Sequence, residues 1–281
     1  MVEDSFIAHE PVVYGSIYFG AMALIATWEA VLPRRALSAT LRIRWIDNFG
    51  LAIINNTLSW IMFPAIGFAF ATLAVERGWG FFNVFSLPDW FAFLISFLLL
   101  DLGKYIQHYL FHYVPLLWRF HTTHHSDQDY DFTTGFRFHP VEWIVITTME
   151  LGIIAAVGAP VAAFLVYEIF QVIVSIMSHG NIWWPVTADR GLRYFVVTPD
   201  MHRIHHSMVV RETNSNFSSI LPWWDWLFGT YIAQPAQSHE TMMIGLSEFR
   251  DRKHLTLGWL LTYPLLARTS ETPRRRTEAS A

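Results

Sequence analysis

The sequence contains no cysteine and few charged residues. Without thiols the chain cannot form disulfides, iron–sulfur clusters or cysteine-ligated zinc sites, and it cannot use a thiolate nucleophile. Charged side chains make up only 15% of the 281 residues, and a net charge of −4 offers no basic surface for nucleic acid. More than half of the residues are hydrophobic, which is typical of a protein that is partly solvated by lipid.

Several catalytic motifs are also missing. The chain has no G-x-S-x-G and no phosphate-binding glycine loop, so a serine hydrolase of that type and a P-loop enzyme are excluded. It has no H-E-x-x-H, the zinc motif of many metalloproteases. It has no Glu-x-x-His pair, which carboxylate-bridged metal sites in helical bundles require. Any metal chemistry must therefore come from another ligand pattern.

Four apolar stretches predict membrane-spanning helices, since about 20 apolar residues cross the hydrocarbon core. Pro64 is expected to bend the second stretch. The third begins after Pro88 and Asp89, and its second half continues as a polar helix. The fourth is a pair whose short first half favours either two spans or a shallow re-entrant hairpin. In order, the stretches cover residues 12–32, 49–75, 90–112, and the pair 143–157 and 160–178.

The positive charges predict how these spans are oriented. The connection between the first two spans holds Arg34, Arg35, Arg42 and Arg44, whereas the next loop holds only Arg77. Because connections rich in arginine and lysine stay in the cytosol, we expect the first connection to be cytosolic and the N-terminus to lie outside. The third span then returns to the cytosol.

Ten of the thirteen histidines lie between residues 108 and 206, and most of them are patterned. Residues three or four apart share one face of a helix, so H-x-x-x-H offers two imidazoles to one metal ion. H-x-x-H-H offers three, and its adjacent pair diverges by about 100°, which lets it reach two neighbouring ions. The pattern consists of His108 and His112; His121, His124 and His125; His202, His205 and His206; and the single residues His139 and His179.

The positions of the histidines along the spans predict one shared site. At about 1.5 Å per residue, the helix from Trp90 to His108 covers roughly one hydrocarbon thickness, so His108 emerges at the cytosolic surface. His179 ends the last apolar stretch on the same side. We therefore expect all the boxes at one membrane face. The three histidines without patterned neighbours, which we expect to have no function, are His9, His239 and His254.

The boxes and their surroundings resemble the fatty acid hydroxylase/sterol desaturase superfamily of membrane oxygenases over about residues 90–232. The sequence departs from the family at Ser218, where a glycine is usual, and in lacking a second histidine near His179. The missing histidine favours the sterol-desaturase-like subgroup. Besides the boxes, the resemblance rests on Asp101-x-x-x-Tyr105-x-x-His108, Arg137-Phe-His139-Pro140-x-Glu142, Ser178-His179-Gly-Asn181, Thr198-Pro199 before the third box, Asn214-x-Asn216-Phe217 and Trp224-Asp225-x-Leu227-Phe228-Gly229-Thr230.

The resemblance implies a centre of two iron ions that uses O2 and external electrons to hydroxylate or desaturate a lipid. Zinc bound during expression is an expected artefact, because imidazole suits several metals. His139 is implied either as a tenth ligand or as a neighbour of the ligands. Asp101, Asn181 and Asp225 are implied to orient ligand imidazoles. The implied ligands are His108, His112, His121, His124, His125, His179, His202, His205 and His206.

The implied partners are a membrane lipid and an electron donor of the ferredoxin or cytochrome type. Four arginines are candidates for the landing site of an acidic donor protein. The lipid class stays open, with sterols and fatty acyl chains among the alternatives. The candidate landing residues are Arg137, Arg193, Arg203 and Arg211.

Two other functions remain open. A metal transporter would place few ligands near the membrane midplane on broken helices, unlike the many ligands expected here. A zinc-dependent membrane hydrolase would need a general base, for which Glu142 is the only near candidate. The predicted fold is an all-α integral membrane protein with about four transmembrane helices or hairpins and a cytosolic helical cap that carries the site. The predicted parts are the N-terminal spans 1–89, the histidine-box domain 90–232, and an amphipathic segment with a disordered tail, 233–281.

Overall fold

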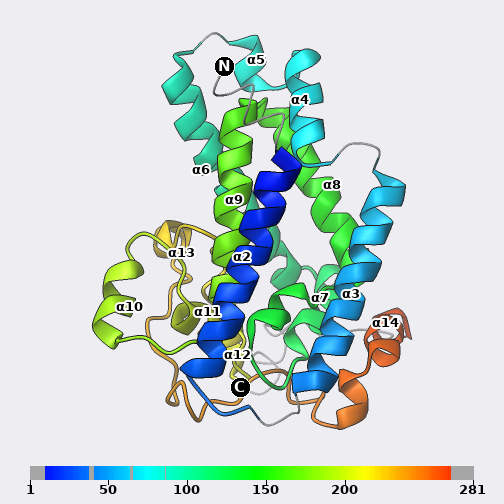
Figure 1. Cartoon of the computed structure of the whole chain (residues 1–281), viewed down its shortest axis with the longest axis vertical. Coiled ribbons are helices and arrows are strands. Elements are labelled where there is room, and N and C mark those ends of the chain that lie inside the picture. Colours follow the sequence, from blue (N-terminus) through cyan, green and yellow to red (C-terminus); the bar gives the residue numbers. More distant parts are fainter. Residues whose placement is uncertain (1–9, 38–40, 64–65, 86, 267–281) are drawn as a thin grey trace.

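The computed structural model describes residues 10–37, 41–63, 66–85 and 87–266, and in these residues the fold is entirely helical (Figure 1). Two isolated bridges, Pro33 with Ile182 and Ser207 with Ile244, are the nearest approach to β-structure in these ranges. The predicted all-α class is confirmed. The long helices are α2 (Glu10–Val31), α3 (Leu41–Met62), α6 (Asp89–Tyr113), α8 (Pro140–Val157) and α9 (Val161–Ser178).

Shorter helices complete the fold and gather mainly around the ends of the long ones. They are α4 (Phe68–Glu76), α5 (Phe81–Val84), α7 (Pro115–His125), α10 (Val186–Leu192), α11 (Pro199–His205), α12 (Val210–Thr213), α13 (Trp223–Phe228) and α14 (Leu257–Leu266), with the 3-10 turns η1 (Phe132–Phe136) and η2 (Arg252–Leu255). In Figure 1, α4 and α5 lie at the upper end of the molecule, and α7, α11 and α12 lie in its lower half.

Among the described residues, three helices are long and apolar enough to cross a membrane: residues Val12–Val31, Pro140–Val157 and Val161–Ser178. A fourth span arises if 68–84 and 89–113 are counted together, although this pair is bent by 97°. The predicted first and fourth stretches therefore appear as expected. The first half of the fourth pair extends to 18 residues, about 27 Å of helix, which is long enough for a span.

The second stretch differs from its prediction. It consists of two helices, because α3 ends at Met62 and α4 begins at Phe68; Pro64, where the bend was predicted, lies outside the described residues. Helix α3 also starts at Leu41, well before the apolar stretch, so its first turns carry charges and it does not rank among the candidate spans. The charged first half of α3 packs near the histidines, which is why the sequence combines polar and apolar halves there.

The core lies between α6, α8 and α9. Leu100, Ile154 and Phe164 are buried in one cluster contributed by these three helices, and α2 packs along α9 (Figure 1). The turn between α8 and α9 depends on Gly158, which has φ +64 and whose added Cβ would lie 2.4 Å from the Trp79 carbonyl oxygen. Only glycine allows this approach without strain.

The outer faces of the long helices are apolar. Trp60 on α3 is 82% exposed, and Phe19 on α2 and Trp90 on α6 are also exposed. Large exposed hydrophobic side chains spread over several helices are typical of surfaces that face lipid. The predicted amphipathic segment contains the apolar α14, which packs on α3 and α7. The predicted disordered tail falls on residues 267–281, outside the described residues.

Candidate metal centre

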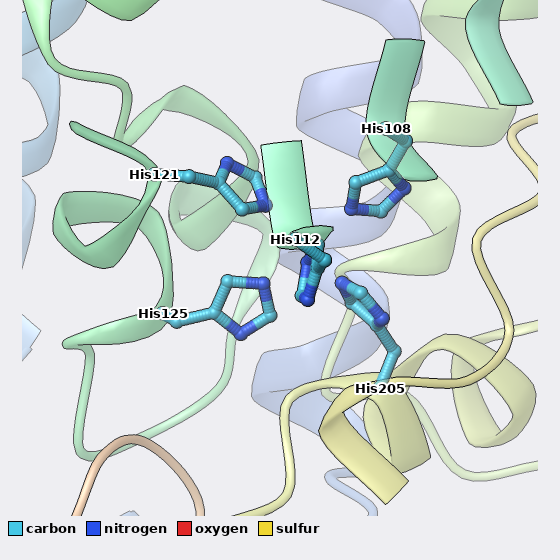
Figure 2. A group of neighbouring side chains, drawn as sticks. All are labelled: His108, His112, His121, His125 and His205. Carbon is cyan, nitrogen blue, oxygen red and sulfur yellow. The ribbon is translucent and has the colours of Figure 1, made fainter. Parts of the chain in front are cut away.

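The structure brings nine of the ten predicted histidines into two adjoining groups. In each group the potential ligand atoms lie within 4.8 Å of one another. Figure 2 shows the imidazoles of one group converging from separate helices. The first histidine group is His108 and His112 from α6, His121 and His125 from α7, and His205 from α11; the second histidine group is His124 from α7, His179 directly after α9, and His202 and His206 at α11.

The adjacent histidines of both H-x-x-H-H boxes divide between the groups. His125 joins the first group and His124 the second, and likewise His205 joins the first and His206 the second. This is the divergence that helical geometry predicts for neighbouring residues. The ring centroids of His125 and His206 are only 4.6 Å apart. Two ions held by these groups would therefore be close neighbours.

Hydrogen bonds fix the imidazole tautomers in the first histidine group. The Nδ1 atom of His108 lies 2.9 Å from the Phe217 carbonyl oxygen, and that of His205 lies 2.7 Å from the Ser215 carbonyl oxygen. A carbonyl oxygen can only accept, so each Nδ1 carries the proton and donates it. Each Nε2 then keeps a free lone pair, as a metal ligand requires.

The opposite ring nitrogens in this group have no hydrogen-bond partner although they are buried. Buried polar atoms in proteins are almost always paired, so an unpaired set pointing at one place indicates a missing ligand. This observation shows that the side chains fit a metal ion. The unpaired atoms are the Nε2 atoms of His112, His121, His125 and His205.

The second histidine group shows the same arrangement. The Nδ1 atom of His179 lies 2.8 Å from the Ser175 carbonyl oxygen and therefore donates to it. The Nε2 atom of His179 lies 3.1 Å from that of His202 and 3.4 Å from that of His124. Nitrogens about 2.1 Å from a shared ion are separated by roughly 3.0–3.4 Å, so these distances suit common ligation. The Nε2 atom of His206 is buried and unpaired.

Burial keeps these imidazoles uncharged. It lowers the pKa of His179 to about 4, and it lowers the pKa of His124, His202 and His206 well below the usual value. Neighbouring imidazoles lower them further, because a second positive charge nearby is unfavourable. A neutral imidazole is the form that binds metal.

Glu142 is the acidic partner of the centre, and the sequence suggested it only as a hydrolase base. Its Oε1 accepts a hydrogen bond from Nδ1 of His121, and the carboxylate is fully buried. A carboxylate behind a histidine fixes the ring and makes it a stronger ligand. The sequence could have indicated this role, because Glu142 ends the Arg137-Phe-His-Pro-x-Glu motif that accompanies the histidine boxes.

We expect Glu142→Ala to weaken metal retention by about 10–100-fold, the usual effect of losing such a partner. The measurement is metal content after dialysis against graded concentrations of a chelator. Glu248→Ala, at an exposed carboxylate, is the matched control and should behave as the unaltered protein does. Equal retention by both variants would show that Glu142 does not support His121.

The structure corrects the expectation for Asp101, Asn181 and Asp225, none of which contacts an imidazole. Asp101 accepts hydrogen bonds from the backbone of Ile220 and Leu221 and from the Trp224 indole. Asp225 accepts from the backbone of Phe217 and Ser218, and Asn181 pairs with the backbone of Arg35. The two aspartates shape the loop 217–225, so they act on His108 only through the Phe217 carbonyl.

His139 is also corrected as a candidate ligand. Its Nδ1 accepts a hydrogen bond from the Val141 amide at 3.1 Å and so caps the start of α8. The proton then resides on Nε2, which donates to the Leu261 carbonyl oxygen at 3.1 Å. Both ring nitrogens are engaged, and His139 belongs to neither histidine group. His139 therefore caps the start of α8 and connects it to α14 through the hydrogen bond to Leu261.

The predicted arginine landing site is also wrong for three of its four residues. Arg137 and Arg203 are fully buried and Arg193 is 4% exposed, so they cannot meet a partner protein. Arg203 pairs with Asp200, and Arg193 pairs with Asp189. Only Arg211 is exposed. Arg137 instead donates to the Thr123 carbonyl oxygen, the Asn48 side chain and the Ser126 hydroxyl.

A buried ion-pair cluster attaches α3 to the segment that follows α7. Arg44 forms a double hydrogen bond with Asp127 and a further one with Asp131, and all three side chains are 1% exposed. Burial alone would raise the pKa of Asp127, but the Arg44 and Arg137 guanidinium groups outweigh it and hold that pKa below its usual range. The cluster holds the end of α7, and with it His124 and His125, against α3.

Fold and site together define a helical protein with membrane-spanning helices and a histidine-only centre suited to two metal ions. Residues 93–230 match the family model described as fatty acid hydroxylase. The chain belongs to the fatty acid hydroxylase/sterol desaturase superfamily. The predicted superfamily is thereby confirmed, whereas the sterol-desaturase-like subgroup stays a prediction.

Named relatives come from bacteria, animals and plants. The ornithine lipid hydroxylase OlsE of Rhizobium tropici is 28% identical over 235 residues, which are 80% of this chain and 69% of that protein. The alkylglycerol monooxygenase of Homo sapiens is 28% identical over 178 residues, 60% of this chain but 36% of that protein. The very-long-chain aldehyde decarbonylase GL1-4 of Oryza sativa subsp. indica is 26% identical over 165 residues, which are 54% of this chain and 25% of that protein. No solved structure shows significant similarity.

Proposed function

We propose that this protein is a membrane-bound oxygenase that hydroxylates a lipid, using O2, a centre of two iron ions and electrons from a separate protein. The observation that carries the proposal is the pair of adjoining histidine groups with unpaired, buried Nε2 atoms. Membership of the fatty acid hydroxylase superfamily supports the reaction class. Hydroxylation is preferred to desaturation because relatives carry the names hydroxylase and monooxygenase.

Iron is part of the proposal, because imidazole ligands alone suit zinc, copper, iron and nickel equally. When bound, the ions would supply the activation of O2. The chain's own contribution is to fix the ring orientations through the acceptors at Nδ1 and to exclude water. Every member of the two groups except the partly exposed His108 is buried, so little water reaches them.

The place of the site favours a lipid substrate over transport or hydrolysis. His112 lies near the end of α6, His179 follows α9, and Glu142 begins α8, so the centre sits at a common end of three long helices. A transporter would place its ligands midway along broken helices. For a hydrolase, Glu142 would have to be a free base, but it is already bonded to His121.

The reaction is tested with labelled oxygen. Membranes that contain the protein are supplied with candidate lipids, a ferredoxin or cytochrome reductase system and 18-oxygen gas, and the lipids are analysed by mass spectrometry. We expect one labelled oxygen in the product, none without reductant, and none with a His205→Ala variant. A double bond without label would indicate a desaturase. Product that forms equally well without O2 would refute an oxygenase.

We further propose that the centre faces the cytosol and that residues 1–89, 90–232 and 233–281 form the three functional parts of the chain. Reporter domains inserted after Ser126 and after Ser207 should then report the cytosol, and one inserted at Asn83 should report the opposite side. The reason is the arginine-rich connection before α3. The measurement uses two reporters, one active only in the cytosol and the other active only on the opposite side of the membrane. If Asn83 and Ser126 report the same side, the orientation is wrong.

A further inference from the structure

A small, mostly apolar cavity between α6, α8 and α9 is bordered by four polar side chains inside the membrane-spanning part of the protein. It lies among helices that otherwise pack through apolar side chains. Polar and ionisable groups at such depth are costly and usually functional. None of the cavity residues belongs to the two histidine groups. The lining residues are Leu100, Lys104, Gln107, Glu150, Ile153 and Tyr167.

The charges of the cavity are paired but not enclosed. The Lys104 ammonium lies 3.0 Å from Glu150 Oε2, and these side chains remain 18% and 23% exposed. Glu168 on α9 forms a side-chain hydrogen bond with Glu150. Two carboxyl groups can share a hydrogen bond only if one of them is protonated. The three groups together therefore carry no net charge.

Tyr167 supplies an independent sign of a missing ligand. Its side chain is 1% exposed, and its ring packs edge-on against Phe97. Its hydroxyl has no hydrogen-bond partner, although it lies within electrostatic range of Asp101, Glu150 and Glu168. A buried hydroxyl left unpaired is unfavourable and usually marks a bound water or ligand.

We propose that this cavity binds a hydroxyl group at the polar end of the substrate lipid. Tyr167 donates a hydrogen bond to the oxygen of that hydroxyl, which in turn donates its own proton to the Glu150 carboxylate. A hydroxyl satisfies both partners at once, whereas an ether or methyl group cannot donate. The small size of the cavity favours a group of this size over a bulky charged head group.

The position of the cavity also fixes which carbon is oxidised, an inference that rests on the proposed function. Lys104 precedes His108 by one turn of α6, about 5.4 Å along the helix axis. A lipid held by its hydroxyl in this cavity would bring the carbons nearest its polar end to the histidine groups. The far end of its chain would extend away from them. Oxidation is therefore expected close to the polar end.

The test uses metal-free protein in lipid nanodiscs, so that no turnover can occur. The probes are hexadecan-1-ol and 1-methoxyhexadecane, which share the same chain but differ in hydrogen-bond donation. Native mass spectrometry or quenching of tryptophan fluorescence gives their dissociation constants. We expect the unaltered protein to prefer the alcohol by about fivefold, the effect of one modest net hydrogen bond. Glu150→Gln should reduce this preference, because the Glu150 carboxylate accepts the proton that only the alcohol can donate. Tyr167→Phe should weaken the binding of both probes, because an alcohol oxygen and an ether oxygen both accept its hydrogen bond.

Tyr167→Phe is well suited to the test because the hydroxyl it removes has no partner in the protein, so its melting temperature should not fall. Tyr194→Phe, at an exposed tyrosine, is the control and should keep the preference. Equal binding of the two probes by the unaltered protein would overturn the proposal and leave a water-filled cavity. Unchanged binding of both probes by Tyr167→Phe would overturn it as well. Because binding is read without metal, failure to oxidise any lipid would refute the proposed function without deciding this result.

Discussion

His205→Ala and His124→Ala are each expected to abolish both metal retention and activity. His205 belongs to the first histidine group and His124 to the second, so each variant removes one ligand and leaves an unpaired cavity among buried imidazoles. The unaltered protein, reconstituted with iron, should hold about two ions per chain if each group binds one. Metal is measured by mass spectrometry against protein quantified by amino-acid analysis, and activity by the labelled-oxygen assay.

Two other histidines serve as controls for this result. His239 lies in neither group, and its nearest charged neighbour is Asp200 at 3.7 Å. His139→Asn keeps a side chain that can cap α8, so it should retain both ions, as His239→Ala should. A stoichiometry near one together with full activity in His124→Ala would contradict the dinuclear centre. Loss of metal in His139→Asn would restore His139 as a ligand.

Asp127→Ala is expected to cause the largest loss of stability outside the histidines. It removes the double hydrogen bond to Arg44, whose guanidinium is 1% exposed and would be left with Asp131 as its one ion-pair partner, besides the Thr134 hydroxyl. Breaking one partner of a buried ion pair typically costs about 3–5 kcal/mol. The measurement is the melting temperature of metal-free protein in detergent, which separates this effect from metal loss.

Asp251→Ala is the matched control for that measurement. Asp251 forms an ion pair with Lys253, but both side chains are about 70% exposed, and exposed pairs contribute little to stability. Its melting temperature should therefore stay close to that of the unaltered protein. If Asp127→Ala melted at the same temperature as Asp251→Ala, the cluster around Arg44 would not be what attaches α3 to the cap.

The histidine groups could be predicted from the sequence because their geometry is local. Spacings of three and four place imidazoles on one helix face, and adjacent residues diverge, so the division of His124 from His125 follows from the helix alone. The start of α6 and the break at Gly158 were also encoded locally, by Pro88 and Asp89 and by a glycine two residues before Pro160.

What the sequence did not reveal depends on tertiary contacts. The acceptors at Nδ1 of His108 and His205 are backbone carbonyls, which every residue possesses, so no side-chain pattern marks them. Asp101 and Asp225 stood near the boxes in sequence, but in the fold their oxygens bind backbone amides of one loop. The three buried arginines of the predicted landing site were taken for surface residues because the sequence does not show which charged side chains are buried.

The division of adjacent histidines has a consequence for how the protein is made. Each histidine group draws on α7 and on α11, which are far apart in the sequence. A nascent or truncated chain that ends before α11 therefore completes neither group. If the groups bind metal, a prematurely released fragment would not form one intact half of the centre.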